Sequence, residues 1–270
     1  MDSTASREVA KRYNIQAIPT FVFVDEEGNE IDRIVGFREA DEYLAEMKRI
    51  REGVDTYPDL VRQWDANPQD ANVLQKLAAK VEAMAGLSAA VGYWEELFEL
   101  EDVSTEVHAQ ANLKLAVYHS ETNGDPNTLI SLLKLEKDVD ILAQAHRALR
   151  TFYRTTGDSA AEAEAYRVYV NFMVGIDQEE PGLLNGYAWR MTQLERNLDD
   201  ALMRINRAVE LLPADAGNRE QAQILDTKAE VLWKLGRSDE ALEVIATCIE
   251  LQPEDEYYQE QRSKFQAAES

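Results

Sequence analysis

The chain has 270 residues, 45% of them hydrophobic, and its 51 acidic and 28 basic residues give a net charge of −23. This length and composition predict a folded chain with one long or two ordinary domains, and the charge argues against partners such as nucleic acid or anionic lipid surfaces. The single cysteine excludes an intrachain disulfide, a Cys-x-x-Cys motif and a cysteine-rich zinc site. No apolar run is long enough to predict insertion into a membrane.

Residues 1–53 predict a small α/β unit. In order, its elements are a helix at 6–13, a break at Ile18-Pro19, a strand at 20–25, a turn at 26–29, a strand at 30–35 and, after Gly36-Phe37, a helix with Glu39 in its first turn that ends near Gly53. The first strand is apolar on both faces, as is typical of a strand covered on both sides. The second strand carries charged residues, and we expect it to be less buried and nearer to an edge.

This order of elements resembles the C-terminal half of a thioredoxin, and the segment Tyr13-Asn14-Ile15-Gln16-Ala17-Ile18-Pro19-Thr20-Phe21 carries most of the resemblance. The resemblance implies a cis peptide bond before Pro19 and contact between substrate peptides and the backbone at Ile18. The expected peptide-contacting residues are therefore Ile18, Pro19 and Thr20. The first half of that fold, which holds the two redox cysteines, has no counterpart here, so we predict no catalytic residue in this chain.

Two strands and two helices are too few to cover a strand that is apolar on both faces. One hypothesis is that the sequence is a truncated version of a longer one, with a valine codon before Asp2 read as the start. The longer product would then be a thiol–disulfide oxidoreductase or a thioredoxin-like chaperone, periplasmic or secreted. Otherwise the default expectation is a cytoplasmic, redox-inactive adaptor.

Residues 54–70 are expected to form a linker with one short helix, and residues 71–270 read as helical throughout. Turn signals near Gly86, Gly124, Gly157, Asn197 and Gly236 recur every 33 to 40 residues, a spacing typical of helix-pair repeats. We therefore predict about five helical hairpins, at 71–102, 106–137, 139–174 and, most clearly, 183–213 and 222–253.

The last two repeats are related by a shift of 40 residues, which places Ala201, Ile205 and Pro213 against Ala241, Ile245 and Pro253. These positions, together with Gly236, resemble tetratricopeptide repeats, although Trp189 stands where the last repeat has the small residue Ala229. The predicted fold is mainly α: a tetratricopeptide-like helical-hairpin solenoid preceded by a partial α/β thioredoxin-like half-domain. Such a solenoid implies a concave face that binds proteins or peptides.

By the same resemblance, this groove is expected to be lined by Arg190, Gln193, Asp226, Glu230, Trp233 and Lys234. This mixture favours basic or apolar peptide segments as partners. Cys248 occupies a packing position and is expected to be a buried structural residue. The three histidines are scattered along the chain, so neither a metal site nor a cofactor is expected.

Overall fold

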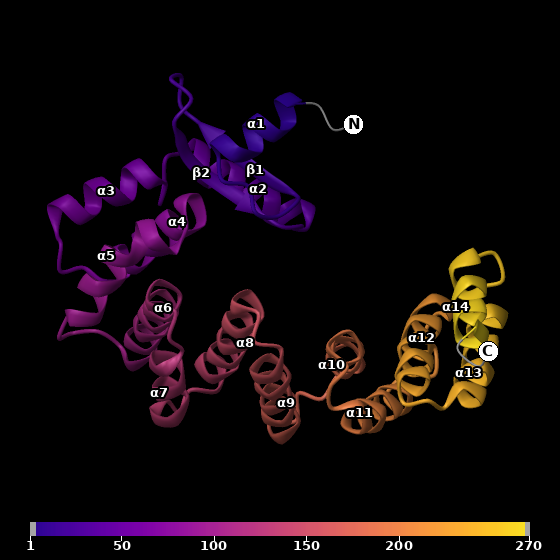
Figure 1. Ribbon diagram of the computed structural model, residues 1–270. Helices are drawn as coiled ribbons and strands as arrows, with labels where there is room; N and C mark the ends of the chain where they lie inside the picture. The colour runs from indigo at the N-terminus through magenta and orange to yellow at the C-terminus, as the bar shows by residue number, and fades with distance from the viewer. Residues whose placement is uncertain (1–3, 268–270) are drawn as a thin grey trace. The chain divides into compact units, whose positions relative to one another are not determined.

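The computed structural model describes residues 4–267 and divides into two compact units, Met1–Ile141 and Leu142–Ser270 (Figure 1). The first unit contains α1 (Thr4–Arg12), β1 (Thr20–Val24), β2 (Glu30–Val35), α2 (Ala40–Arg51), α3 (Tyr57–Ala66), α4 (Ala71–Ala85), α5 (Leu87–Glu99), α6 (Thr105–Asn123) and α7 (Asn127–Leu135). The boundary between the units falls in the first turn of α8 (Val139–Thr156). The second unit continues with α9 (Ser159–Gly175), α10 (Pro181–Leu194), α11 (Leu198–Glu210), α12 (Asn218–Lys234), α13 (Ser238–Leu251) and α14 (Glu256–Ala267).

The two strands form an antiparallel hairpin in which Thr20 pairs with Val35, with an irregularity between Phe23 and Val24. The connecting turn is fixed by Gly28, whose φ of +80° favours glycine. The Arg12 side chain and the Tyr13 hydroxyl both donate hydrogen bonds to the Gly28 carbonyl. These contacts attach the end of α1 to the hairpin turn.

The expectation that the second strand is the less buried one is wrong. Phe21 and Val24 of β1 are 45% and 43% exposed, whereas Asp32 and Ile34 of β2 are 2% and 1% exposed. The reason is that β2 packs against α3 and α4, and the Asp32 carboxylate pairs with Lys80 of α4 and Arg49 of α2. Among the described residues, β1 pairs with β2 alone, so its other edge has no neighbouring strand.

The helices of the first unit pack as successive antiparallel neighbours. Leu60 of α3 is fully buried against Val73 and Leu77 of α4, so the predicted linker helix is part of the packed structure. The following hairpin, α4 with α5, closes around the buried Trp94 indole. Asp70 caps α4 by accepting hydrogen bonds from two backbone amides of its first turn.

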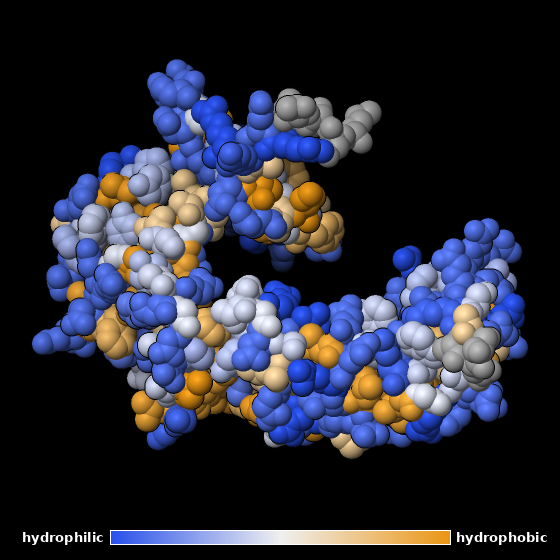
Figure 2. All heavy atoms as spheres, in the orientation of Figure 1, coloured by the Kyte–Doolittle hydropathy of each residue, from blue (hydrophilic) through white to orange (hydrophobic). Residues whose placement is uncertain are grey.

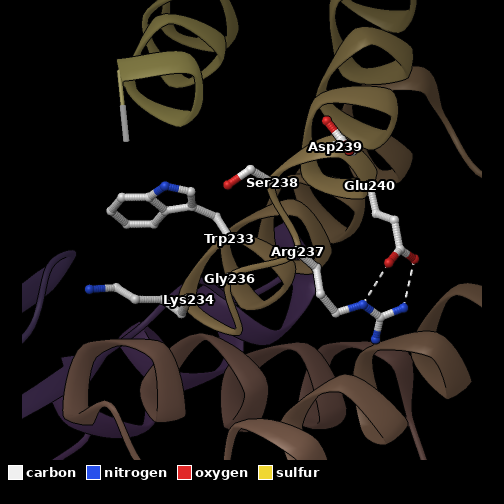
Figure 3. A pocket seen from close by; sticks show the side chains of 7 residues that line it. All are labelled: Trp233, Lys234, Gly236, Arg237, Ser238, Asp239 and Glu240. Atoms are coloured by element: carbon white, nitrogen blue, oxygen red, sulfur yellow. Dashed lines mark hydrogen bonds and ion pairs between the residues drawn. The ribbon is translucent and has the colours of Figure 1, made fainter. Parts of the chain in front are cut away.

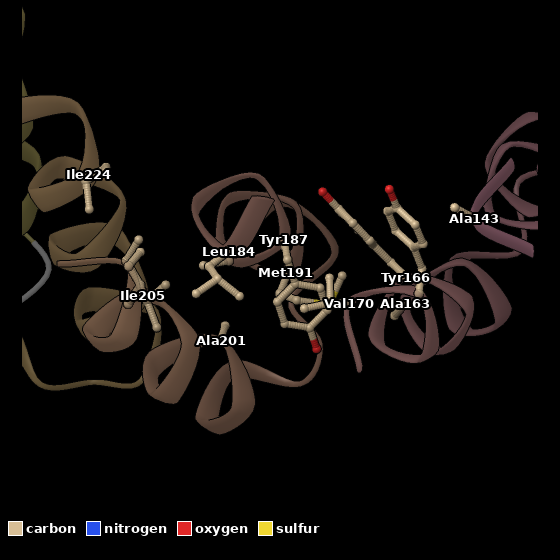
Figure 4. Packing of buried hydrophobic residues seen from close by; sticks show 14 residues of the cluster. Ala143, Ala163, Tyr166, Val170, Leu184, Tyr187, Met191, Ala201, Ile205 and Ile224 are labelled. Atoms are coloured by element: carbon tan, nitrogen blue, oxygen red, sulfur yellow. The ribbon is translucent and has the colours of Figure 1, made fainter. Parts of the chain in front are cut away.

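In the second unit, the first helices of successive hairpins (α8, α10 and α12) follow one another along one side, and α9 and α11 follow along the other (Figure 1). Tyr187, Met191 and Ile205 are fully buried at the centre of its main core cluster, which Figure 4 shows at the junction of α9, α10 and α11. Three fully buried residues of α11 each have a fully buried counterpart 40 residues later in α13. The pairs are Ala201 and Ala241, Ile205 and Ile245, and Ala208 and Cys248. The small side chains at 201, 208, 241 and 248 allow the helices to approach closely.

Trp189, which stands where the last repeat has a small residue, is not buried in the core. Its side chain is 38% exposed, while Ala229, 40 residues later, is fully buried. In the last hairpin, Ala229 packs in a core cluster that also contains Tyr258 and Phe265 of helix α14. The predicted fold class is nevertheless confirmed: the chain is mainly α, with helical hairpins behind a partial α/β unit that contains a two-stranded sheet.

Candidate peptide-binding surfaces

The turn before β1 contains a cis peptide bond between Ile18 and Pro19, as the resemblance implied. The Pro19 carbonyl accepts a hydrogen bond from the Gly36 amide, and the Thr20 hydroxyl donates one to the Ala17 carbonyl. Ile18 itself is 93% exposed, and among the described residues its backbone amide and carbonyl have no hydrogen-bond partner. The turn is thus held rigidly while its Ile18 backbone is free to bind another chain.

A groove of about 630 Å³ borders this turn within the first unit. One wall comes from the thioredoxin-like segment, and the other comes from α4, α5 and α6. The lining residues are Gln16, Ala17, Thr20, Arg33, Val35, Gln75, Ala79, Glu82, Ala83, Trp94, Glu106, Gln110 and Lys114. The groove therefore joins the predicted peptide-contacting turn to the first helical hairpins.

Most of the charges in the groove are already neutralised. Glu82 accepts hydrogen bonds from the Trp94 indole at 3.0 Å and from the Lys114 ammonium at 2.6 Å. Arg33 forms a bidentate pair with Glu30. Glu106 makes no ion pair or hydrogen bond with any described side chain, so it leaves one uncompensated negative charge on the wall. A basic group is the natural complement to such a wall.

A cluster of buried ions fixes the two walls relative to each other. Asp32 of β2 accepts hydrogen bonds from Lys80 of α4 at 2.6 Å and from Arg49 of α2 at 2.9 Å. The neighbouring Arg33 donates to the Ala83 carbonyl at the end of α4, at 2.6 Å, and to the Tyr13 carbonyl at 2.7 Å. We call Asp32, Arg33, Arg49 and Lys80 the docking cluster, since these four side chains join α1, β2, α2 and α4.

Exposed apolar side chains gather on the thioredoxin-like segment. Figure 2 shows hydrophobic surface over the sheet and α2. A second hollow, of about 590 Å³, is lined by Phe23, Val24, Ile31, Leu44, Met47, Lys48, Ile50 and Arg51. The Phe21 ring meets Tyr43 of α2 edge-on at 4.9 Å between ring centroids but still exposes almost half of its area. An exposed apolar surface of this kind is typical of an interaction site.

In the second unit, the predicted groove residues are divided between two environments. Arg190 pairs with the buried Glu162 and donates to Gln193, while Lys234 pairs with Glu195. The other three contact helix α14: the Tyr257 hydroxyl donates to Asp226 at 3.1 Å, Lys264 donates to Glu230 at 2.5 Å, and the rings of Trp233 and Phe265 lie 5.6 Å apart. Whether any of the six binds a peptide stays a prediction, but α14 already covers part of this face.

The turn between α12 and α13 forms a hollow of about 670 Å³, lined by Trp233, Lys234, Gly236, Arg237, Ser238, Asp239 and Glu240 (Figure 3). The Arg237 guanidinium donates two hydrogen bonds of 2.6 Å to Glu240. Figure 3 shows Trp233 and Lys234 extending away from this ion pair. The side chains therefore do not converge on one point where a small ligand would bind.

Burial, with a smaller contribution from the Glu230 charge, raises the pKa of the Asp226 carboxyl from its ordinary value of 3.8 to about 6, against the hydrogen bond from Tyr257. Because the folded-state pKa exceeds the unfolded one, folding stability rises as the pH falls from above 6 toward 4. Asp226→Asn is therefore expected to stabilise the second unit by about 2 kcal/mol at pH 8 and by about half as much at pH 5.

Urea unfolding of the full chain at both pH values measures this difference. Glu243→Gln, which changes an exposed acid of α13 that forms no ion pair, is the matched control and should leave the midpoint unchanged at both pH values. An Asp226→Asn advantage that grows as the pH falls would show that the carboxylate is stabilised by its partners rather than destabilised by burial.

Cys248 is fully buried in α13, and its thiol lies 3.5 Å from the Ala222 carbonyl. Burial raises the pKa of this thiol to about 12, which keeps it protonated and unreactive near neutral pH. The histidines lie against aromatic rings: His108 on Phe98, His119 on Tyr118 and His146 on Phe172. In residues 4–267, no three His, Cys, Asp or Glu side chains are grouped so that they could hold a metal ion.

No helix in the same part of the chain combines the length and hydropathy needed to cross a membrane.

Comparison with known families identifies the first part of the chain. Residues 2–51 match the family model described as a thioredoxin-like domain. The chain thus carries a thioredoxin-like region fused to helical repeats of the tetratricopeptide type, in agreement with the resemblance seen in the sequence. No curated protein sequence matches the chain.

Several solved structures of repeat proteins are similar to this chain at low identity. YrrB, described as a TPR protein with an unusual peptide-binding site, aligns with 14% identity and a TM-score of 0.49 over 76% of this chain and 97% of its own. A Podospora anserina protein described as a kinesin light chain with TPR-like repeats aligns with 12% identity and a TM-score of 0.47, over 69% of this chain and 96% of its own. A TPR protein of Thermus thermophilus aligns with 17% identity and a TM-score of 0.33, over 73% of this chain and 99% of its own.

Two features of these surfaces were missed in the sequence. Asp32 and Arg33 looked like exposed strand residues, because a charge in a strand normally signals solvent, and nothing local identifies Lys80 as a partner 48 residues away. Helix α14 was also overlooked as an element that covers the groove. The run from Tyr257 to Phe265 could have indicated it, since Tyr258 and Phe265 lie seven residues apart on one helical face.

Proposed function

We propose that this chain is a protein-interaction module that binds an extended peptide segment in the groove between the cis-proline turn and helices α4 and α6. The observation that carries the proposal is the turn itself. Ile18 offers an unpaired amide and carbonyl at the border of a groove whose opposite wall presents the side-chain amides of Gln75 and Gln110. Backbone hydrogen bonds of this kind are the usual basis for recognition of extended peptides.

The chemistry of the walls favours a particular peptide. The exposed Ile18 and Val35 side chains offer apolar contact, and Glu106 offers an unpaired carboxylate. We therefore expect an extended segment with an apolar residue next to a lysine or arginine. An acidic segment would meet Glu106 without a compensating cation and is expected to bind more weakly.

The proposed activity is peptide binding alone, without thiol–disulfide exchange. Exchange requires an attacking and a resolving thiol, and the sequence supplies one cysteine, Cys248. That residue lies in α13, and its high pKa opposes formation of the nucleophilic thiolate. What the chain offers a client is thus a surface, in the manner of an adaptor or a holding chaperone.

The groove is tested by filling it. Ala79 is an exposed residue of α4 that lines the groove, so Ala79→Trp should block a peptide without disturbing the core. Fluorescence anisotropy with a fluorescein-labelled octapeptide of leucine, valine and lysine residues should show affinity at least about tenfold lower than for the unchanged chain, or ~1.4 kcal/mol.

Ala89→Trp is the matched control, because Ala89 is an exposed alanine of α5 that lies outside the groove. It should change the affinity less than about twofold, a difference below about 0.5 kcal/mol on the same scale. An unchanged chain that fails to bind the basic apolar peptide, or equal losses in the two tryptophan variants, would contradict the proposal.

A further inference from the structure

A stripe of arginines runs along α8 in the second unit. Arg147, Arg150 and Arg154 are spaced by three and four residues, which places them on one helical face. Arg190 of α10 approaches the same place, since both Arg150 and Arg190 contact the buried Glu162 of α9. We call Arg147, Arg150, Arg154 and Arg190 the arginine face.

This face carries more positive charge than its neighbours neutralise. Glu162 is 2% exposed and is held bidentately by Arg190, at 2.8 and 2.7 Å, whereas Arg150 remains 4.0 Å away from it. No acidic side chain among the described residues lies within ion-pair distance of Arg147 or Arg154. In the described part of the chain, the four arginines therefore have one carboxylate near them, and Arg150 and Arg190 are the two that approach it.

Arg150 is held in place by its neighbours, but one of its hydrogen-bond donors has no acceptor within residues 4–267. Its guanidinium lies over the Tyr166 ring at 3.5 Å, and its buried Nε atom has no hydrogen-bond partner among the described residues. Burial lowers the pKa of this guanidinium, and the charges of Arg154 and Arg190 lower it further. An arginine that is stacked on an aromatic ring has its guanidinium fixed in orientation, which favours pairing with a carboxylate.

Other arginines of the unit show that this arrangement is not general. Arg167 pairs with Glu164, Arg207 with Glu179 and Glu210, and Arg237 with Glu240. Arg196, Arg219 and Arg262 also form no ion pair with a described side chain, but they lie on separate segments, whereas α8 places three arginines on one helical face. A face of arginines left without acids is therefore complementary to an acidic partner.

We propose that the arginine face binds an acidic segment of a partner protein. Arg147 and Arg154 are seven residues apart, or about 10 Å along the helix axis. In a polyproline II segment, residues i and i+3 lie on the same side and about 9 Å apart. Two glutamates separated by two prolines would thus present their carboxylates at the spacing of Arg147 and Arg154.

The probe is a fluorescein-labelled peptide with both ends capped that contains Glu-Pro-Pro-Glu, and Gln-Pro-Pro-Gln is its uncharged counterpart. The full chain at low salt should bind the first at least about tenfold more tightly. R147Q/R154Q should abolish that preference, because both side chains are exposed and removing them leaves the Arg190–Glu162 pair intact. Far-UV circular dichroism confirms that the variant is folded.

R167Q/R207Q is the matched control, since it removes the same charge from α9 and α11. It should keep the preference within about twofold. Equal losses in the two double variants would reduce the effect to overall charge and overturn the proposal, as would an unchanged chain that does not distinguish the two peptides. Tighter binding of a labelled single-stranded oligonucleotide at the same arginines would assign the face to phosphates instead and would also overturn it.

Discussion

Asp32→Leu is expected to lower the free energy of unfolding of the first unit by about 3–5 kcal/mol. The substitution removes the shared acceptor of Lys80 and Arg49, whose side chains are 14% and 23% exposed in the docking cluster. Lys80 would then have to move toward solvent or remain unpaired, while Arg49 would keep Glu46 as its single carboxylate partner. Since Asp32 joins β2 to α2 and α4, the thioredoxin-like segment should also separate from the helical hairpins.

Urea unfolding measures the stability change, and limited trypsin digestion measures the separation, through faster cleavage at the arginines of residues 4–53. The matched control is Asp65→Leu, which changes an exposed aspartate of α3 that has no ion pair. Its effect should stay within about 0.5 kcal/mol. If the two leucine variants unfold at the same urea concentration, the docking cluster does not hold the groove together.

Phe265→Ala is expected to destabilise the second unit by about 3–5 kcal/mol. Phe265 is fully buried, and with Tyr258 it anchors α14 over α12 and α13. Loss of this anchor should expose Asp226, Glu230 and Trp233, the residues of α12 that now contact α14. The backbone amides of α12 should therefore exchange with solvent faster than those of α10.

Hydrogen exchange read by mass spectrometry locates this change, and urea unfolding gives its size. Arg262→Ala changes an exposed residue of the same helix that forms no ion pair and is expected to alter neither. Unchanged exchange in α12 of the Phe265 variant would mean that α14 does not protect the face that the sequence predicted as a groove.

The repeats were predictable because their signals are local. A glycine with positive φ ends α6 at Gly124 and recurs at Gly157 and Gly236, and these positions separate the helices as predicted. The buried alanines at 201 and 241 follow from a 40-residue repeat that is visible in the sequence. The cis bond at Pro19 followed from the resemblance of a nine-residue segment.

The features that were missed depend on contacts between distant segments. The burial of Asp32 requires Lys80, and the covering of Glu230 requires Lys264, 34 residues away. The arginine face is visible as a spacing on α8, but its free charge appears only once Glu162 is seen to be held by Arg190. The sequence shows which residues are charged, but not which residues they pair with in the folded chain.

The central claim is that a peptide binds between the cis-proline turn and the first hairpins. Hydrogen exchange of the full chain, with and without the basic apolar octapeptide, tests it most directly. We predict slower exchange at residues 15–20 and in α4 and α6, with no change in α10 and α12. Protection confined to α10 and α12, with none at residues 15–20, would contradict the account.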